Sequence, residues 1–319
     1  MNKLLFVFLS LITILYGCKK TDTNNQQWTA VNNGLPANTA VFAIAVKDSN
    51  IYLGTSAGIY LSVNNGNSWA NMDVGFGNYM VTTIVFQGNN IIAGTQGKGI
   101  FISGNSGSSW NAINYSPANV TMLAVQRNNL YAVTDNGICL SVDSGRSWNV
   151  LNNCPSFVAT LAIQGNNIYA ATDSLVYLSV NNGSNWTALN NSPSAISAMA
   201  LNGNNIYGGT SAGSIGNQLT SDVYLSANNG ISWTSISNGL PLNTPVNCLT
   251  SRGNSIYAAT VSGVYVSVNN GTSWSGLCSG LPLNSQYNTA FEVHVLVAGG
   301  NYIYAGTDGG VYRLQTNSQ

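Results

Sequence analysis

The segment SVNNGNSW (62–69) decides the fold, because close copies of it recur along the chain. The copies are SGNSGSSW (103–110), SVDSGRSW (141–148), SVNNGSNW (179–186), SANNGISW (226–233) and SVNNGTSW (267–274). Six of the seven tryptophans end these segments, and the seventh is Trp28. Subtracting their residue numbers gives spacings of 41, 41, 38, 38, 47 and 41 residues between consecutive tryptophans. A period near 40 residues is typical of repeat proteins in which each unit packs on its neighbours.

One repeat unit predicts four short strands. In VFAIAVKDSNIYLGTSAGIYLSVNNGNSW (41–69), apolar runs rich in Val, Ile and Tyr alternate with Gly, Asn and Ser turns. The fourth run starts at Trp69, after an Asn-Gly pair that favours a tight hairpin because both residues tolerate positive φ. Four strands per unit of about 40 residues indicate one blade of a β-propeller.

The count of second-strand residues predicts seven blades. These residues are Tyr52, Ile92, Tyr131, Tyr169, Tyr207, Tyr257 and Tyr304. The last unit (293–314) stops after three strands, and WTAVNNGLP (28–36) matches WTSISNGLP (233–241), which spans a fourth strand. We therefore expect an all-β, seven-bladed β-propeller of four-stranded blades, whose ring is closed by an N-terminal strand completing the last blade.

The repeated segments resemble the Asp-box, or BNR repeat, of sialidase-type propellers. The Asp-box position is held by Asn64, Asn105, Asp143, Asn181, Asn228 and Asn269, and the closing aromatic by Trp69, Trp110, Trp148, Trp186, Trp233 and Trp274. A carboxylate or amide oxygen here can accept hydrogen bonds from its own turn, and the glycine that follows suits positive φ. The resemblance implies a structural role on the face opposite the usual active site.

The N-terminus predicts export. Lys3 precedes an apolar stretch from Leu4 to Tyr16, which has the length of a signal peptide and is too short to span a bilayer. The sequence LYGC (15–18) resembles a bacterial lipobox, although an ordinary cleaved signal is the alternative. We expect a signal peptide (1–17), a lipidated Cys18 with a flexible tether (18–27) and one propeller domain (28–319), held in the bacterial cell envelope by lipid alone.

Composition narrows the classes of partner. Charged residues are 6% of the chain and the formal net charge is zero, which argues against nucleic acid because phosphate contacts need clustered Lys and Arg. His294 is the single histidine, and the cysteines lack metal-ligand spacing, so we expect no metal and no cofactor. Cys139–Cys154 and Cys248–Cys278 could pair in an oxidising compartment, or all four could stay buried thiols.

Irregular loops indicate a binding face. In a propeller the linkers between blades share one face with the turns between second and third strands. Blade five lengthens such a turn (211–222), and the linker into blade seven is long (279–291). Gly-Leu-Pro occurs in three linkers of blades five to seven, at 34–36, 239–241 and 280–282. Long loops on a regular scaffold favour function, so we expect ligand contacts from Tyr287, Phe291, His294 and Asp222.

Carboxylates on this face are the candidates for chemistry. They are Asp135, Asp173, Asp222, Asp308 and Glu292, the single glutamate. Two of them within reach of one sugar could act as acid and base, whereas Asp residues in such turns commonly act as caps.

Sialidase activity is not expected despite the resemblance. That family clamps its substrate carboxylate with three arginines and carries an Arg-Ile-Pro segment. The four arginines here, Arg127, Arg146, Arg252 and Arg313, fall in segments of the opposite face, and no Arg-Ile-Pro occurs. Xyloglucanase-type propellers are similar in their boxes but use two propellers, and photosystem assembly-factor propellers are similar in scaffold but carry an arginine patch that is absent here.

The sequence therefore favours a monomeric, lipid-anchored binding or scaffold protein. It would recognise a glycan or an envelope protein through the loop-rich face of blades five to seven, without catalysis. The alternative is a glycoside hydrolase using a carboxylate pair on that face, and a third reading is a purely structural spacer.

Overall fold

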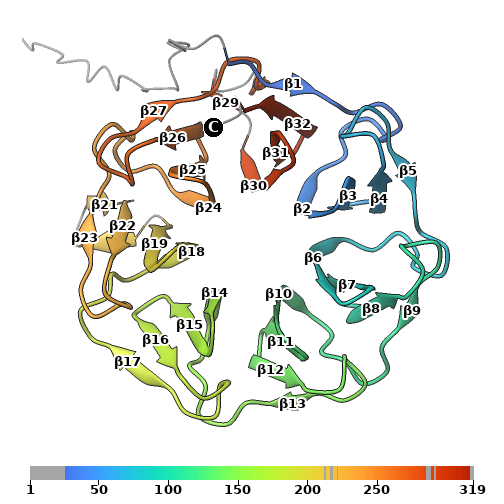
Figure 1. Cartoon of the computed structure of the whole chain (residues 1–319), viewed down its shortest axis with the longest axis horizontal. Coiled ribbons are helices and arrows are strands. Elements are labelled where there is room, and N and C mark those ends of the chain that lie inside the picture. Colours follow the sequence, from blue (N-terminus) through green and yellow to red (C-terminus); the bar gives the residue numbers. More distant parts are fainter. Residues whose placement is uncertain are drawn as a thin grey trace, which may run out of the picture.

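The computed structural model describes residues 26–211, 213–215, 218–220, 222–284, 289–290 and 292–316. Seven antiparallel four-stranded sheets are arranged as blades around a central channel, which confirms the predicted seven-bladed propeller (Figure 1). Blades one to three are β2 (Val41–Lys47), β3 (Asn50–Thr55), β4 (Gly58–Ser62), β5 (Ala70–Asn71); β6 (Val81–Gln87), β7 (Asn90–Thr95), β8 (Ile100–Ser103), β9 (Asn111–Ala112); and β10 (Val120–Gln126), β11 (Asn129–Thr134), β12 (Gly137–Ser141), β13 (Asn149–Val150).

The remaining blades repeat this order. They are β14 (Val158–Gln164), β15 (Asn167–Thr172), β16 (Val176–Ser179), β17 (Thr187–Leu189); β18 (Ile196–Asn202), β19 (Asn205–Thr210), β22 (Val223–Ser226), β23 (Thr234–Ser235); β24 (Val246–Arg252), β25 (Ser255–Thr260), β26 (Gly263–Ser267), β27 (Ser275–Gly276); and β30 (Val293–Gly299), β31 (Tyr302–Thr307), β32 (Gly310–Gln315) with β1 (Thr29–Ala30).

The N-terminal strand closes the ring as predicted. In β1, Thr29 pairs with Arg313 and Ala30 with Tyr312 of the last strand, so blade seven combines both ends of the chain. Trp28 is 2% exposed, and its indole Nε1 donates to the Leu277 carbonyl of blade six at 2.7 Å. No unpaired sheet edge therefore remains at the seam between the first and last blades.

Each repeated S-x-N/D-x-G-x-S-W segment makes the turn between the third and fourth strands. In blade one the amide of Gly66 donates to Ser62 Oγ (2.8 Å), and the amide of Ser68 donates to Asn64 Oδ1 (3.0 Å). Asn65 and Gly66 both have positive φ, at 57° and 84°, as the Asn-Gly hairpin predicts. The other five segments repeat the Ser–Gly bond, which supports the predicted structural role.

A second ring of bonds joins neighbouring blades at the end of each first strand. The side chain of the last residue of this strand donates a hydrogen bond to the beginning of the next blade's second strand or to the turn before it. Gln87 donates to the Asn128 carbonyl at 2.8 Å, and Asn202 donates to the Gly253 carbonyl at 2.9 Å. The same bond is made by Lys47, Gln126, Gln164 and Arg252. Blade seven has Gly299 instead, where an added Cβ would lie 2.8 Å from Val46.

The linkers between blades fall into two kinds. In one kind an apolar side chain packs between the box tryptophan and the third-strand aromatic of the following blade. Leu281, for example, shares a core cluster with Trp28 and Tyr312, and Phe76 lies against Phe101 with ring centroids 4.4 Å apart. We call these linker residues plugs; they are Leu35, Phe76, Leu240 and Leu281.

Three of the four plugs are the leucines of Gly-Leu-Pro. The preceding glycine is needed because the loop lies against backbone: a Cβ at Gly280 would sit 2.1 Å from the Trp28 carbonyl oxygen. The tryptophans covered in this way are buried, at 2–6% exposure: Trp28, which has no box, and the box residues Trp69, Trp110 and Trp274. The Gly-Leu-Pro motif that the sequence associated with a binding face is therefore a packing device.

The linkers into blades three, four and five have Ser-Pro or Cys-Pro and no plug. The box tryptophans of these blades are Trp148, Trp186 and Trp233, and all three are half-buried. Ser116 and Ser192 of these linkers instead accept, on Oγ, the backbone N–H of Ile100 (3.0 Å) and Val176 (2.8 Å) in the preceding blade. Cys154 occupies the same place at the end of blade three.

Neither cysteine pair considered from the sequence is formed, and the alternative of four free thiols is also wrong, because Cys278 is disulfide-bonded. Cys139, Cys154 and Cys248 are free thiols, so neither Cys139–Cys154 nor Cys248–Cys278 is a disulfide. Cys139 is 5% exposed, as expected for a core filler. Burial raises its pKa and raises that of Cys248 to about 11, so both thiols are protonated at neutral pH.

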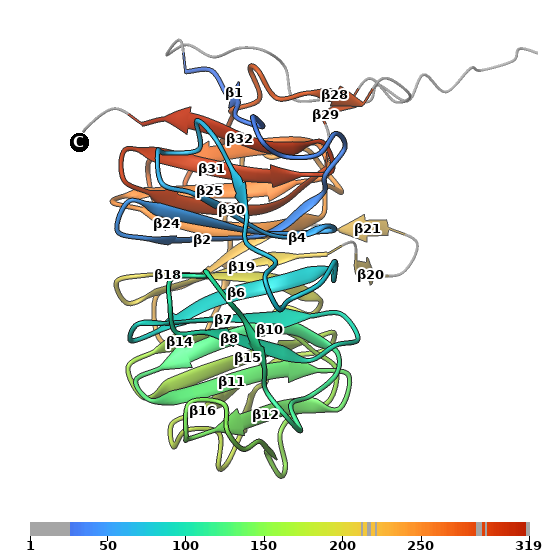
Figure 2. The ribbon, with the colours of Figure 1, turned by 90° about the vertical axis from the view of Figure 1, so that its right-hand side faces the viewer.

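Both long loops contain a short hairpin. The blade-five loop holds β20 (Gly213–Ile215) paired with β21 (Gln218–Thr220), and the linker into blade seven holds β28 (Leu283–Asn284) paired with β29 (Thr289–Ala290). The β20–β21 hairpin projects beyond one face of the ring (Figure 2). Within the described part of the chain, no helix long and apolar enough to span a bilayer occurs.

Candidate functional site

Three sequence-predicted residues lie at the end of blade seven where its first strand begins. The β30–β31 ladder starts with Val293 opposite Thr307, so Glu292 and Asp308 follow on facing chains at its open end. His294 Nε2 lies 2.7 Å from Asp308 Oδ1, and this is the single contact between a carboxylate and a basic side chain among the residues that the structure describes. The pair is solvent-accessible, with side chains 20% and 49% exposed respectively.

Residues of both neighbouring blades complete this group. Asn247 of blade six donates from Nδ2 to Glu292 Oε1 (3.0 Å) and to the Val293 carbonyl (3.1 Å). On the other side, the Phe42 ring of blade one lies 5.2 Å from the His294 ring, centroid to centroid. We call Phe42, Asn247, Glu292, His294 and Asp308 the blade-seven cluster.

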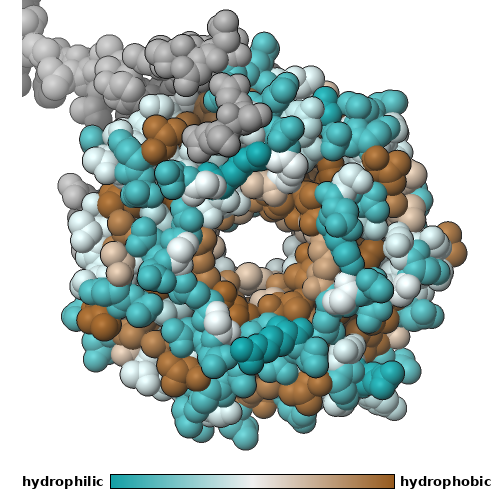
Figure 3. All heavy atoms as spheres, in the orientation of Figure 1, coloured by the Kyte–Doolittle hydropathy of each residue, from teal (hydrophilic) through white to brown (hydrophobic). Residues whose placement is uncertain are grey.

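The cluster lies at the mouth of the central channel. Phe42, Asn247 and His294 are each the second residue of a first strand, and the first strands are innermost in every blade (Figure 1). The space-filling view shows an opening through the centre of the ring with largely apolar residues around it (Figure 3). A ligand at the cluster would therefore meet polar groups beside an apolar, concave surface.

The other predicted carboxylates are separate from this cluster. Asp135 of blade three accepts from Asn119 Nδ2 at 2.7 Å, and Asp222 of blade five accepts from the Tyr224 hydroxyl at 3.2 Å. Burial and the Asp222 charge raise the pKa of Tyr224, so this hydroxyl stays a neutral donor. Asp173 of blade four is exposed, and its carbonyl accepts from the Ala195 amide. A ring of carboxylates directed at one ligand is therefore not formed.

Three further candidates, Tyr287, Phe291 and Cys18, lie outside the described residues. In the described part of the chain, no group of three His, Cys, Asp or Glu side chains is suited to hold a metal ion.

The arginines lie at the opposite face, as predicted. Arg313 Nη1 donates to the Asn65 carbonyl in a box turn at 2.6 Å, and its guanidinium stacks on the Tyr302 ring, 4.7 Å from the centroid. Arg252 donates to the Tyr302 carbonyl. Arg146 lies within a box and Arg127 in the turn between the first two strands of blade three. No arginine in the described chain is near the blade-seven cluster, so it offers no clamp for an anionic ligand.

Sequence reasoning missed Asn247 and Phe42. Their signal is a column of the repeat, the second residue of each first strand, which reads Phe42, Thr82, Thr121, Ala159, Ser197, Asn247 and His294. Thr82, Ser197 and Asn247 each bond to the carbonyl of the next blade's first strand, whereas His294 and Phe42 contact one another. Three positions of the column therefore make the same bond between blades, and at the seam between blades seven and one a ring contact stands in its place.

Comparisons with known proteins agree on the fold. The family model described as the DUF6242 beta propeller domain matches residues 1–119, which is less than half of the chain. No curated protein matches the sequence.

Solved structures provide more distant likenesses. YCF48 bound to D1 peptide has a TM-score of 0.73 at 14% identity, covering 97% of this chain and 100% of that one. The extracellular domain of BT4673 from B. thetaiotaomicron has a TM-score of 0.74 at 18% identity, covering 92% of this chain and 40% of that one. The GH74 xyloglucanase from Xanthomonas campestris has a TM-score of 0.70 at 16% identity, covering 90% and 53%. At these identities the likeness concerns the propeller fold and leaves binding and hydrolysis both open.

Proposed function

We propose that the protein is a non-catalytic binding protein that holds a neutral glycan at the blade-seven cluster. The observation that carries the proposal is a pair of contacts at the start of β30 by the channel mouth: His294 with Asp308 and Phe42, and Glu292 with Asn247. Carboxylate and amide groups accept and donate hydrogen bonds to sugar hydroxyls, and an aromatic ring packs on the apolar face of a sugar. The same groups could receive a polar protein loop, which is the competing ligand.

The charge of the cluster supports a neutral ligand. The cluster contains two carboxylates and one imidazole, of which Asp308 contacts His294, and the arginines are bonded to backbone or lie at the other face. A sialic acid or uronic acid would bring a further negative charge without a cationic partner, which is costly. A neutral glycan avoids that repulsion.

Exposure supports binding over hydrolysis. A general acid that works near neutral pH usually needs a carboxyl whose pKa is raised by burial. Glu292 is exposed and the Asp308 side chain is 49% exposed, so neither is desolvated. Both are also held by hydrogen bonds, to Asn247 and His294. These features suit fixed acceptors for hydroxyl groups.

Hydrolysis is the second candidate function, because one observation favours it. Glu292 and Asp308 are the one pair of predicted carboxylates in a single blade, on facing chains. A glycan that bridged them could exclude water and change their ionisation on binding. The alternative therefore predicts new reducing ends that depend on both carboxylates.

Purified protein spanning residues 19–319 tests the proposal. Binding to a panel of neutral and acidic polysaccharides should be followed together with reducing-end release, for the wild type and for Glu292→Gln, Asp308→Asn and Asp173→Asn. Asp173→Asn is the matched control, since it removes one exposed carboxylate from another blade of the same face. We expect binding of a neutral glycan without cleavage, lost in the two blade-seven variants and kept in the control. Equal binding by all four proteins would refute the site.

The cellular location completes the proposal. The apolar segment from Leu4 to Tyr16 and Cys18 support export and lipid anchoring in a bacterial envelope. Cys18→Ala should abolish incorporation of a fatty-acid label and release the protein from membranes. Full labelling of that variant would rule out this anchor.

A further inference from the structure

One blade departs from the repeat at its third strand. In six blades the same position of this strand is aromatic: Tyr60, Phe101, Tyr177, Tyr224, Tyr265 and Tyr312. Blade three has Cys139 there, paired across the strands with Val150. A thiol fills much less space than a phenol ring, so a hollow is expected unless a neighbour fills it.

No neighbour fills it, because the linker into blade three also lacks a plug. The structure has a pocket of about 280 Å³ at this place, lined among others by Pro117, Cys139, Trp148 and Val150. The pocket opens to solvent, since its lining residues Tyr115 and Val150 are 100% and 56% exposed. Blade three is thus the one blade in which the described chain combines an unplugged linker with a missing ring.

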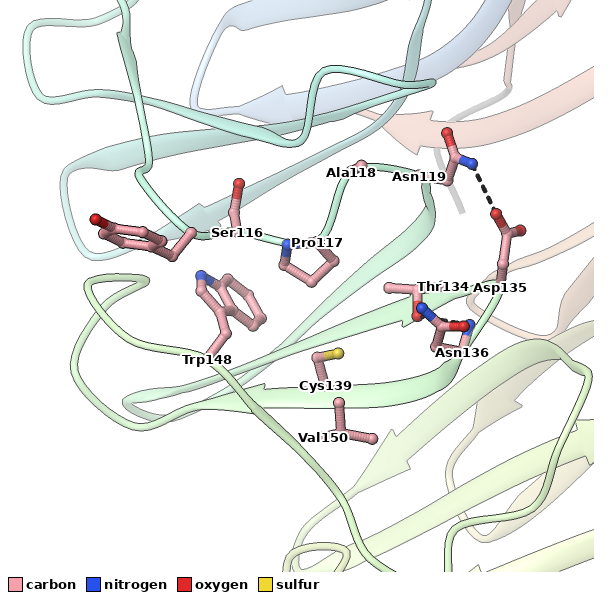
Figure 4. A pocket seen from close by; sticks show the side chains of 11 residues that line it. Ser116, Pro117, Ala118, Asn119, Thr134, Asp135, Asn136, Cys139, Trp148 and Val150 are labelled. Atoms are coloured by element: carbon pink, nitrogen blue, oxygen red, sulfur yellow. Dashed lines mark hydrogen bonds between the residues drawn. The ribbon is translucent and has the colours of Figure 1, made fainter.

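The two ends of the pocket differ in chemistry (Figure 4). Trp148 lies at one end, with Pro117, Cys139 and Val150 in the middle. At the other end Asn119 Nδ2 donates to Asp135 Oδ2 at 2.7 Å, which fixes both side chains and leaves an oxygen of each available as an acceptor. Asn136 adds an amide beside Asp135.

We propose that this pocket is a binding site for one neutral pyranose ring of a glycan, stacked on Trp148 and hydrogen-bonded by Asn119, Asp135 and Asn136. A pyranose has an apolar C–H face and a rim of hydroxyl groups, which matches an indole at one end and fixed polar groups at the other. The pocket volume is at the lower end of the range for small-molecule sites, which suits a single ring.

The same lining disfavours other occupants. The pocket has one carboxylate and no cationic side chain, so an anionic sugar would leave its charge unpaired. An aromatic side chain from a protein partner would fit the apolar part, but it carries at most one hydroxyl or N–H. It would cover Asn119, Asp135 and Asn136 without satisfying them, which costs free energy.

This inference rests on the proposed function, because both sites would bind a neutral glycan. The pocket is a second site, separate from the blade-seven cluster. The pocket belongs to blade three and the blade-seven cluster to blades six, seven and one, so variants at the two places report independently. Loss of glycan binding in Glu292→Gln with full binding in a blade-three variant would support the proposed function and refute the pocket. The reverse result would support the pocket alone.

Cys139→Tyr is the sharpest test, because it restores the residue type found at this position in most blades and fills the pocket. The probes are methyl glycosides of glucose, galactose, mannose and N-acetylglucosamine, followed by saturation-transfer NMR and by tryptophan fluorescence. Trp148→Ala is the second variant, in case the tyrosine misfolds, and Trp186→Ala is its matched control in blade four, where Tyr177 is present.

We expect at least one glycoside to bind the wild type with a dissociation constant on the order of millimolar, as is typical for a ligand of this size. Cys139→Tyr should keep its melting temperature and weaken binding at least tenfold, Trp148→Ala should weaken it similarly, and Trp186→Ala should retain it. Failure of all four glycosides to bind, or unchanged binding in Cys139→Tyr, would overturn the proposal. Displacement of the glycoside only by a tyrosine-containing peptide would reassign the pocket to a protein ligand.

Discussion

Replacing the plug Leu281 by alanine should destabilise the propeller at its seam. Leu281 is 6% exposed and packs with Trp28 and with the third-strand aromatic Tyr312, as the other plugs pack with a tryptophan and a third-strand aromatic. Leucine-to-alanine changes in cores cost about 2–5 kcal/mol, depending on how far the surroundings collapse. Because this linker can move inward from the surface, we expect a loss of about 2–3 kcal/mol, in the lower part of that range.

Guanidinium denaturation followed by tryptophan fluorescence measures this loss. Leu242→Ala is the matched control, because Leu242 also lies in an interblade linker but is 91% exposed. It should change the free energy of unfolding by less than about 0.5 kcal/mol. If both alanine variants unfold at the same denaturant concentration as the wild type, the plug interpretation of Gly-Leu-Pro is wrong.

Three further predictions concern the repeated hydrogen bonds. Cys154→Ser should stabilise the protein by about 0.5–1.5 kcal/mol, because a hydroxyl would supply the hydrogen-bond acceptor that Ser116 and Ser192 supply in their linkers. An unchanged or lower free energy of unfolding in the same denaturation assay would contradict this prediction. Asp143 accepts from Ser147 and Ser141, which lowers its pKa from 3.8 to about 2, so its contribution to stability is complete above about pH 4 and is lost as pH falls through 2. Asp143→Asn should remove that part of the acid dependence, measured as unfolding free energy between pH 5 and 2, and an identical profile would refute the assignment. Asn202→Ala should cost about 0.5–1.5 kcal/mol by breaking its bond to the Gly253 carbonyl, and thermal melting would show no shift if that bond contributes nothing.

The architecture could be predicted because every level of the sequence repeats. Two features of the sequence predicted the closure by β1. Trp28 has no preceding box, and the last unit ends after three strands. The face of each arginine also followed from its place in the repeat, as Arg313 and Arg252 confirm. Strand order and face depend on local pattern, which a single sequence carries.

Contacts between blades could not be predicted in the same way. The Gly-Leu-Pro linkers were interpreted as part of a binding face, but their leucines pack on the following blade. Such a contact joins residues far apart in the sequence, from Leu35 with Tyr60 to Leu281 with Trp28 at opposite ends of the chain, and it depends on the distance between blades, which no local pattern gives. The contact between His294 and Asp308 likewise depends on the β30–β31 register, which sets Val293 opposite Thr307.

The blade-three pocket shows a signal that was present but incompletely used. Cys139 was identified as a replacement for the third-strand tyrosine and was expected to be buried, which is correct. The pocket forms because the 113–119 linker also lacks a plug. That second difference becomes evident only in the structure, where other linkers cover their tryptophans.

The central claim is that the blade-seven cluster binds a neutral glycan without cleaving it. The most direct measurement is a titration of the wild type and of Asp308→Asn with each neutral polysaccharide of the panel, with reducing ends counted in the same samples. Saturable binding by the wild type, weak binding by Asp308→Asn and no new reducing ends would agree with the account. New reducing ends that disappear in Asp308→Asn would make the protein a hydrolase, and equal binding by both proteins would place the ligand elsewhere.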